Sequence, residues 1–330
     1  MAIVIAIKDS NQLKPYADSL CYKNFDIEWL QQHAIDHHCV CLDGQQIARA
    51  RCSMWWQSVP SYQDKRLGVI GHFYSDSANA TEQLLTYASN YLRQIGCNLA
   101  VGPMDGNTWR HYRFISERGS EPSYFLEPDN HDSWPLEFKR NGFTELTNYS
   151  SALTNDINRE NASLAKIRTR SKAHGVTFRS LDMTQFENEL DLIYALSVVS
   201  FQDNFLYTPI NRDEFIQMYA KVKPYVQPEL TLFAELEGDL IGYLFGIPNV
   251  LQKQHGQTID TFIIKTVAVD PHHRGGGLGA LLVSEAQQRA YALGYRSAIH
   301  ALMHKSNNSR NISNHYAKTI RRYSIYSKHL

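Results

Sequence analysis

Residues 266–290 read TVAVDPHHRGGGLGALLVSEAQQRA, and this stretch decides the fold of the 330-residue chain. The alternation of Val267 and Val269 predicts a strand that ends before Pro271. Glycines follow, and after them apolar residues recur at helical spacing. Glycines allow a ligand to approach the backbone closely, and the first amides of a helix have no acceptor within it. The stretch therefore predicts a strand, a turn and a helix start that bind a pyrophosphate.

The residues that this turn lacks indicate which kind of pyrophosphate it binds. A nucleoside-triphosphate loop ends in Gly-Lys followed by Ser or Thr, whereas this turn ends in Gly279-Ala280. A dinucleotide fold needs the spacing G-x-G-x-x-G with an acidic residue about twenty positions later, and that spacing is absent. The turn does match R-x-x-G-x-G, on Arg274, Gly277 and Gly279, preceded by V-x-V-D-P.

This combination resembles the coenzyme A loop of the GNAT superfamily of acetyltransferases. The resemblance implies that backbone amides of the turn bind the pyrophosphate of acetyl-CoA, with Arg274 as an additional cation. It also implies that the main chain of Val267 to Val269 pairs with the pantetheine arm and polarises the thioester. The alternative is an ordinary glycine turn at the start of an amphipathic helix. The coenzyme-binding residues expected from the resemblance are Val267, Ala268, Val269, Arg274, Gly275, Gly276, Gly277, Leu278, Gly279, Ala280 and Asn308.

Composition excludes several other classes of protein. The 33 basic and 33 acidic residues cancel, so no nucleic-acid or anionic-membrane partner is expected from bulk charge. No apolar run approaches the roughly eighteen residues of a membrane span, and no charged-then-apolar leader is present. We therefore expect a soluble, cytoplasmic protein without a membrane partner.

Five cysteines lie in the first hundred residues, an odd number that is typical of reduced thiols. The run His37-His38-Cys39-Val40-Cys41 contains four possible metal ligands. A zinc site normally draws on a second cluster to complete four ligands, and no second Cys/His pair at ligand spacing follows. We therefore expect these residues to be structural members of a strand, and no metal.

The chain contains one α/β unit twice. Asp43-Gly44 in the first half and Glu237-Gly238-Asp239 in the second each separate two apolar runs and predict a tight β-hairpin. A strand, a helix, a glycine and another strand follow in both halves. A further strand at 176–179 and a helix at 184–200 precede the second hairpin. The paired elements are predicted at 38–42, 47–52, 67–73, 80–95 and 98–101, and again at 230–236, 240–245, 262–269, 278–293 and 297–302.

This order is similar to the core of the GNAT fold, which implies an α/β protein, with a mixed sheet of the α+β kind, made of two tandem GNAT-like domains. We expect a degenerate domain without a pyrophosphate loop at 1–154, a linker at 155–175, and an acetyl-CoA-binding catalytic domain at 176–330. In place of the glycine turn, the first half has Ser75 to Ala80, in which Ser77 or Asn79 can cap a helix. Cations in the linker either remain solvated or attract the phosphates of the coenzyme or an acidic substrate.

The chemistry implied by the resemblance is direct transfer of the acetyl group to an amine in a ternary complex. Such a reaction needs coenzyme placement, a polarised thioester, a base for the ammonium and an acid for the thiolate. The family pattern places the acid at Tyr316, after Asn308. Because Gly-Phe does not follow as it does in the family, Tyr323 and Tyr326 remain alternatives.

Neither the base nor the acceptor is specified by the sequence. Five residues are candidate bases, and a water relay without one essential base is equally open; they are Glu235, Glu237, Asp260, His300 and His304. The acceptor is expected to be a small-molecule or peptide amine, and the oligomeric state is not indicated. A coenzyme A-binding sensor without turnover and an enzyme with another acyl donor are the alternatives. Aromatic residues in predicted loops either line an acceptor cleft or hold the halves together; they are Trp55, Trp56, Trp109, Tyr112, Tyr124, Trp134, Phe201, Phe205 and Tyr207.

Overall fold

The computed structural model describes residues 2–159, 162–306 and 317–330. Within these ranges one mixed sheet runs through both halves of the molecule, in the order β1-β2-β3-β4-β5-β13-β7-β12-β11-β10-β9-β8, with β6 attached to β13. The strands are β1 (Ile3–Ile7), β2 (His37–Leu42), β3 (Ala48–Trp55), β4 (Leu67–Ser75), β5 (Leu99–Gly102), β6 (Phe114–Glu117), β7 (Thr144–Thr154), β8 (Thr177–Ser180), β9 (Leu232–Leu236), β10 (Asp239–Pro248), β11 (Thr261–Val269), β12 (Ser297–His304) and β13 (Lys318–His329).

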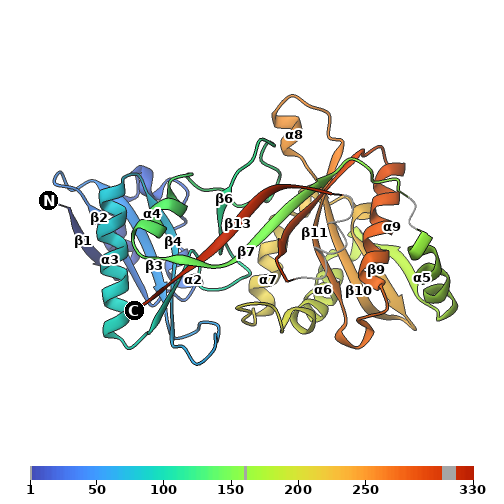
Figure 1. Ribbon diagram of the computed structural model, residues 1–330, viewed down its shortest axis with the longest axis horizontal. Helices are drawn as coiled ribbons and strands as arrows, with labels where there is room; N and C mark the ends of the chain where they lie inside the picture. The colour runs from blue at the N-terminus through green and yellow to red at the C-terminus, as the bar shows by residue number, and fades with distance from the viewer. Residues whose placement is uncertain (1, 160–161, 307–316) are drawn as a thin grey trace.

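The helices gather into two lobes at the ends of this sheet (Figure 1). One lobe carries α3 and α4, and the other carries α5 and α9, with α6 and α7 beside the strands of the second half (Figure 1). No helix within the described ranges is both long and apolar enough to span a membrane. The helices are α1 (Ser10–Leu13), α2 (Trp29–Gln32), α3 (Ala78–Gln94), α4 (Trp134–Arg140), α5 (Ala162–Ala173), α6 (Phe186–Phe201), α7 (Arg212–Ala220), α8 (Leu251–Gln254) and α9 (Leu278–Ala292).

The two long helices α3 and α9 occupy corresponding places and bury the same kind of face. On α3, Leu84, Leu85 and Leu92 are fully buried against the strands of the first half. On α9, Leu281 and Leu282 are fully buried against the second half. Each fully buried leucine contributes about 1.5–3 kcal/mol relative to an exposed one. The helical spacing of these residues therefore fixes which face of each helix meets the sheet.

The last strand of the chain crosses from one half to the other. Strand β13 pairs with β5 of the first half, Tyr326 opposite Gly102, and runs beside β7 for most of its length. Strand β7 in turn pairs with β12 of the second half, Ala298 opposite Thr154. Figure 1 shows β13 and β7 side by side between the lobes, with the C-terminus in the same lobe as the N-terminus. Each half of the sheet is therefore continued by a strand from the other half.

The predicted α/β class with a mixed sheet is confirmed, and the two hairpins form where expected, as β2–β3 and β9–β10. Ser77 rather than Asn79 caps α3, since its Oγ accepts a hydrogen bond from the amide of Ala80 at 3.2 Å. The 155–175 segment, expected as a linker, contains α5, which packs against α9.

The His/Cys run forms part of strand β2, as expected. His37 stacks on Tyr91 with 4.3 Å between ring centroids, and Cys39 lies in the hydrophobic core with its sulfur 3.5 Å from that of Cys52. All five cysteines are free thiols.

Candidate active site

The sheet opens between β11 and β12 in the second half. The two strands pair in parallel only from Thr261–Ser297 to Ile264–His300, yet β11 continues to Val269 and β12 to His304. A bulge lies at the point of separation, because Lys265 has no opposite residue on β10 between the pairs Phe245–Thr266 and Gly246–Ile264. A bulge bends its strand and increases the local twist. The main chain of β11 beyond the bulge is therefore not covered by β12.

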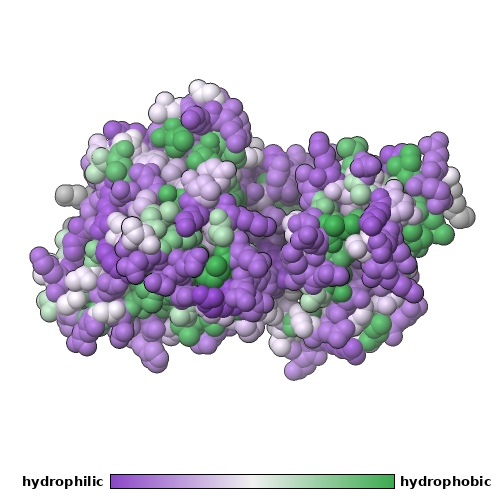
Figure 2. All heavy atoms as spheres, turned by 180° about the vertical axis from the view of Figure 1, so that it is seen from behind, coloured by the Kyte–Doolittle hydropathy of each residue, from purple (hydrophilic) through white to green (hydrophobic). Residues whose placement is uncertain are grey.

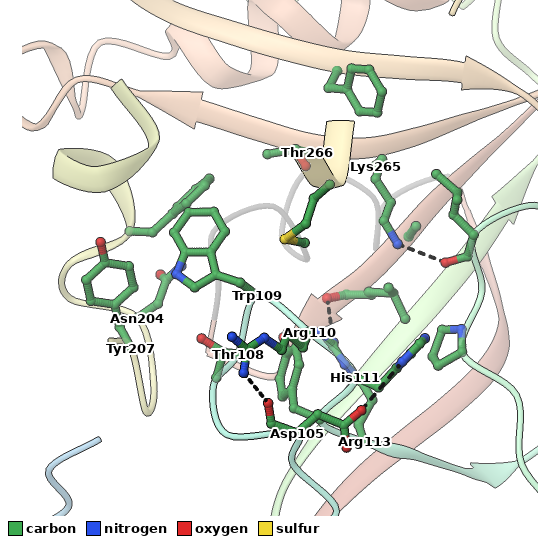
Figure 3. Close-up of a pocket in the computed structure, with 18 of the residues that line it drawn as sticks. Asp105, Thr108, Trp109, Arg110, His111, Arg113, Asn204, Tyr207, Lys265 and Thr266 are labelled. Carbon is green, nitrogen blue, oxygen red and sulfur yellow. Dashed lines mark hydrogen bonds and ion pairs between the residues drawn. The ribbon is translucent and has the colours of Figure 1, made fainter. Parts of the chain in front are cut away.

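A pocket of about 970 Å³ lies at this opening and is lined by both halves of the chain. The second half contributes the separated ends of β11 and β12, Val283 of α9, and the segment between α6 and α7. The first half contributes residues 105–113, between β5 and β6. Figure 3 shows these walls, with Lys265 and Thr266 facing the side that carries Arg110 and His111. Figure 2 shows the molecule from behind the view of Figure 1, and this surface is mostly hydrophilic with separate hydrophobic patches.

The glycine turn forms the start of α9 as predicted. Gly277 is the N-cap residue with a left-handed φ of 84°, and no side chain caps the helix. A Cβ on Gly277 would lie 2.6 Å from Cδ1 of Ile167, which belongs to α5. Arg170 of the same helix donates a hydrogen bond to the carbonyl of Gly276 at 2.8 Å. Helix α5 therefore borders the turn, and one linker cation is already bonded to it.

The other predicted coenzyme residues occupy the strand and the helix start. Val267 lines the pocket, Ala268 is buried, and the carbonyl of Val269 accepts a hydrogen bond from the Ser200 hydroxyl at 3.1 Å. The remaining predicted coenzyme residues belong to the turn or to the first residues of α9; they are Gly275, Leu278, Gly279 and Ala280.

Arg274 makes contacts that the sequence does not predict. Its guanidinium donates a hydrogen bond to the carbonyl of Ser200 and lies 3.5 Å from the carboxylate of Asp203. The side chain is 43% exposed. In this structure Arg274 therefore connects the turn to the end of α6.

The predicted acid Tyr316 and the predicted contact Asn308 lie outside the described residues. The two alternative tyrosines are fully buried, and neither lines the pocket. Tyr323 donates a hydrogen bond to Glu127, and burial raises the pKa of its hydroxyl well above the ordinary value. Tyr326 pairs with the first half of the sheet. Neither side chain is placed to protonate a group in this pocket.

Two of the five candidate bases line the pocket, His300 and His304. Burial lowers the pKa of His300 to about 4, and burial together with Lys305 and Arg113 lowers that of His304 to about 4. Both imidazoles are therefore neutral at pH 7, and each is a weaker base than an ordinary histidine. Among the others, Glu235 is ion-paired with Arg179 at 2.7 Å.

Of the wall that the first half contributes, Trp109 and Tyr112 were candidates from the sequence, but the charged residues beside them were not. Arg113 is 9% exposed and lies between two tyrosine rings, 3.7 Å from the centroid of Tyr112 and 4.0 Å from that of Tyr149. Arg110 bridges the halves through an ion pair of 2.6 Å with Glu214. These residues come from the half that lacks the glycine turn, and only the strand exchange brings them to β11.

Among the described lysines, Lys265 has the most strongly shifted pKa, and it lines the pocket. Its Nζ donates a hydrogen bond to the carbonyl of Leu126 at 3.0 Å. Burial and the nearby Arg113 lower its pKa to about 7, against an opposing effect of Glu127. Lys265 therefore exchanges its proton in the physiological range.

His111 and Asp105 form a third polar group at this wall. Nδ1 of His111 lies 3.7 Å from the Asp105 carboxylate, and this carboxylate raises the pKa of His111. The His111 side chain lines the pocket among other protein residues, and 76% of it is exposed. Burial opposes ionisation of Asp105, but His72 and His111 outweigh it and lower the pKa of the carboxyl.

The aromatic residues divide between the two roles considered for them. Trp55 and Tyr124 are buried in hydrophobic cores. Five others line the pocket, namely Trp109, Tyr112, Phe201, Phe205 and Tyr207. Trp109 also donates a hydrogen bond to the carbonyl of Thr208 at 2.9 Å, so it contacts both halves.

Comparison with known proteins agrees with this geometry. Residues 193–316 match the model of the acetyltransferase (GNAT) family. A curated bacterial ceramide synthase from Caulobacter vibrioides (strain NA1000 / CB15N) is 25% identical over 202 residues, which is 59% of this chain and 51% of the relative. This chain therefore spans about half the length of that relative.

Solved structures show the same fold at low identity. A tandem GNAT protein from the clavulanic acid biosynthesis pathway superposes on all of this chain and 98% of its own, with 10% identity and a TM-score of 0.51. A GCN5-related glucosamine N-acetyltransferase region of a fungal multi-domain protein covers 99% of this chain and 38% of its own, with 14% identity and a TM-score of 0.53. The expected likeness to tandem proteins of the GNAT superfamily is confirmed.

Proposed function

We propose that the second half of this chain, which is similar to tandem proteins of the GNAT superfamily, binds acetyl-CoA and transfers the acetyl group to an amine acceptor in the pocket between the halves. The observation that supports this most is the opening between β11 and β12. The pocket at this opening is lined by Val267 of β11 and Val283 of α9, and both halves border it.

In this proposal the coenzyme is held by the residues of the turn and the strand. The amides of Gly277 to Ala280 bind the pyrophosphate, since no side chain makes a capping hydrogen bond at the start of α9. The main chain of Val267 to Val269 pairs with the pantetheine arm, and an amide there polarises the thioester carbonyl. Asn308 is proposed as a further coenzyme contact.

The reaction is a single displacement on the thioester. The amine nitrogen attacks the carbonyl carbon, the N–C bond forms and the C–S bond breaks. The proton of the ammonium passes to a water or to one of the two pocket histidines, of which His304 contacts Thr147 and Ser306 and His300 contacts Gln287, and Tyr316 supplies a proton to the leaving thiolate. A tyrosine with a pKa near 10 is able to protonate a thiolate.

A second candidate is transfer of a longer acyl group on the same scaffold. It is favoured by the ceramide synthase relative and by a pocket whose walls include Phe245, Leu302 and Met303. The two candidates differ in donor and share the site.

The test follows free thiol while acetyl-CoA and palmitoyl-CoA are each incubated with the protein and a panel of amines. Thiol release that requires an amine supports transfer, and the ratio of kcat/KM for the two donors decides between the candidates. Tyr316→Phe is expected to lower kcat by about 10² while coenzyme affinity stays the same. Tight coenzyme binding without thiol release from either donor would instead indicate a sensor.

A further inference from the structure

Two cations approach the pocket from different halves of the chain. Arg113 lies between β5 and β6 of the first half, and Lys265 occupies the bulge of β11. Their charges act on one another, because Arg113 contributes to the lowered pKa of Lys265. Figure 3 shows both side chains among the residues that line the pocket.

Neither cation has a carboxylate at ion-pair distance in the part of the chain that the structure describes. Arg113 donates to the carbonyl of Leu302 at 3.3 Å, and Lys265 to that of Leu126. Glu127 acts on Lys265, but its carboxylate is bonded to Arg321 at 2.8 Å.

The remaining acidic groups near this wall are also engaged. Asp105 is shared by His72 and His111, and Glu214 is paired with Arg110. The sequence of residues 307–316, which follows the pocket residue Ser306, contains no Asp or Glu.

Two like charges held near each other in a partly desolvated pocket repel, and an anion placed between them removes this cost. Arg113 is suited to such a role because its guanidinium carbon lies close to the rings of both Tyr112 and Tyr149, which restrict the movement of the side chain. A pre-ordered guanidinium loses little side-chain entropy when it binds an oxyanion.

We propose that Arg113 and Lys265 together bind an anionic group, a carboxylate or a phosphate, carried by the amine acceptor. The inference rests on the proposed function for the reaction of that acceptor. The anion is assigned to the acceptor because an acetyl donor carries no negative charge on its acyl group. The acceptor class is therefore an amine that also bears an acidic group.

Binding without turnover tests the subsite on the full chain. Phenylacetate, phenyl phosphate and the uncharged phenylacetamide are titrated by calorimetry into protein saturated with coenzyme A. We expect at least one of the two anions to bind about tenfold or more tightly than the amide. Arg113→Gln and Lys265→Met should each remove most of this preference.

Lys221→Met is the matched control, because Lys221 lines the same pocket and the variant changes the net charge equally. It is expected to keep the preference for anions. Equal binding of acid and amide, or equal effects of Lys221→Met and Lys265→Met, would overturn the proposal. Lys265 and Arg113 belong to different halves of the chain. If one of the two variants lowers stability, the other still tests the proposal.

Measurements of turnover decide whether the anionic group belongs to the acceptor or to the acyl donor. Phenylalanine is compared with phenylalaninamide, and phosphoethanolamine with ethanolamine, as acceptors for acetyl-CoA. We expect a higher kcat/KM for at least one acidic partner, and loss of that advantage in Arg113→Gln. A strong preference for succinyl-CoA over acetyl-CoA, without any preference among acceptors, would refute the assignment to the acceptor. Anion binding without thiol release would contradict the proposed function while leaving the subsite intact.

Discussion

The two halves of this protein place the same elements around two openings, and among the described residues the large pocket lies at the opening of the second half. In the second half, the end of β11 borders a pocket and α9 begins without a side-chain cap. In the first half, the carbonyl of Met104 lies only 2.0 Å from where a Cβ on Gly71 would be, and the amide of Met104 bonds to Ile70. Ser77 caps α3 with its own hydroxyl.

In our proposal, a small number of local changes closes in the first half the ligand site that the second half retains, while the fold stays the same. One hydroxyl satisfies a helix amide that a phosphate would otherwise contact, and one length of main chain fills the space between two strands. The first half is then free to serve as a wall, and it supplies Arg113 and His111 to its neighbour's pocket.

Removing residues 318–330 is expected to have the largest effect, because it tests whether the halves exist separately. The deletion removes β13, leaves β5 and β7 without a partner on one side, and takes away the fully buried Tyr323, Ile325 and Tyr326. We expect both halves to lose cooperative unfolding, which circular dichroism and hydrogen exchange would measure. A truncated chain that still unfolds in one sharp transition would contradict this.

Changing the glycine turn comes next. Gly277→Val places a β-branched side chain in a left-handed conformation and against Ile167, so we expect coenzyme A to bind at least about a hundredfold more weakly by calorimetry. Gly256→Val is the matched control, since Gly256 also has a positive φ of 73° but nothing within 4 Å. Both variants lose about 1–2 kcal/mol of stability from the backbone, and only the first should lose the coenzyme.

The proposed anion subsite predicts a smaller, pH-dependent effect. Lys265, with a pKa of about 7 in the empty pocket, is protonated below that pH and needs to take up a proton to bind an anion above it. Affinity for phenylacetate should therefore be flat below pH 7 and fall by up to about tenfold per pH unit above it. Arg113, Glu127 and His111 surround this group.

The hydrogen bond to Asp105 raises the pKa of His111, and loss of the His111 charge weakens anion binding in the same direction. In Lys265→Met, the number of protons taken up on anion binding, read from the pH dependence of the affinity, should fall by about one. Any proton uptake that remains in this variant is assigned to His111 if His111→Gln removes it. An unchanged pH profile in Lys265→Met would show that another group is responsible.

The smallest expected effect belongs to the cap of the first half. Ser77→Ala leaves the Ala80 amide without its acceptor and should lower the free energy of unfolding by about 1 kcal/mol. Coenzyme affinity should not change, because α3 is not the coenzyme helix in our proposal. Asn79→Ala, two residues later, is the control and is expected to change stability by less than about 0.5 kcal/mol in thermal unfolding.

Local patterns in the sequence predicted the elements well and their assembly poorly. The glycine turn, both hairpins and the helices α3 and α9 were predictable, since each depends on residues that are near one another in the chain. The predicted glycine turn lies at the start of α9, and its binding of a coenzyme stays a prediction.

The exchange of β7 and β13 was not predictable, because strand pairing between distant segments leaves no periodic signal. For the same reason the wall with Arg113 was missed, and with it the unpaired cations of the pocket. Arg274 was expected at a phosphate, but its contacts with Ser200 and Asp203 depend on where α6 ends in space.

The exchanged strand also determines the order in which the protein is completed during synthesis. Strand β5 leaves the ribosome well before its neighbour β13, which lies more than two hundred residues later in the chain. Until β13 is made, one side of β5 presents unpaired amides and carbonyls, which is the kind of edge that recruits foreign strands. The nascent amino-terminal lobe therefore has to remain incomplete, and protected from aggregation, until β13 has been synthesised.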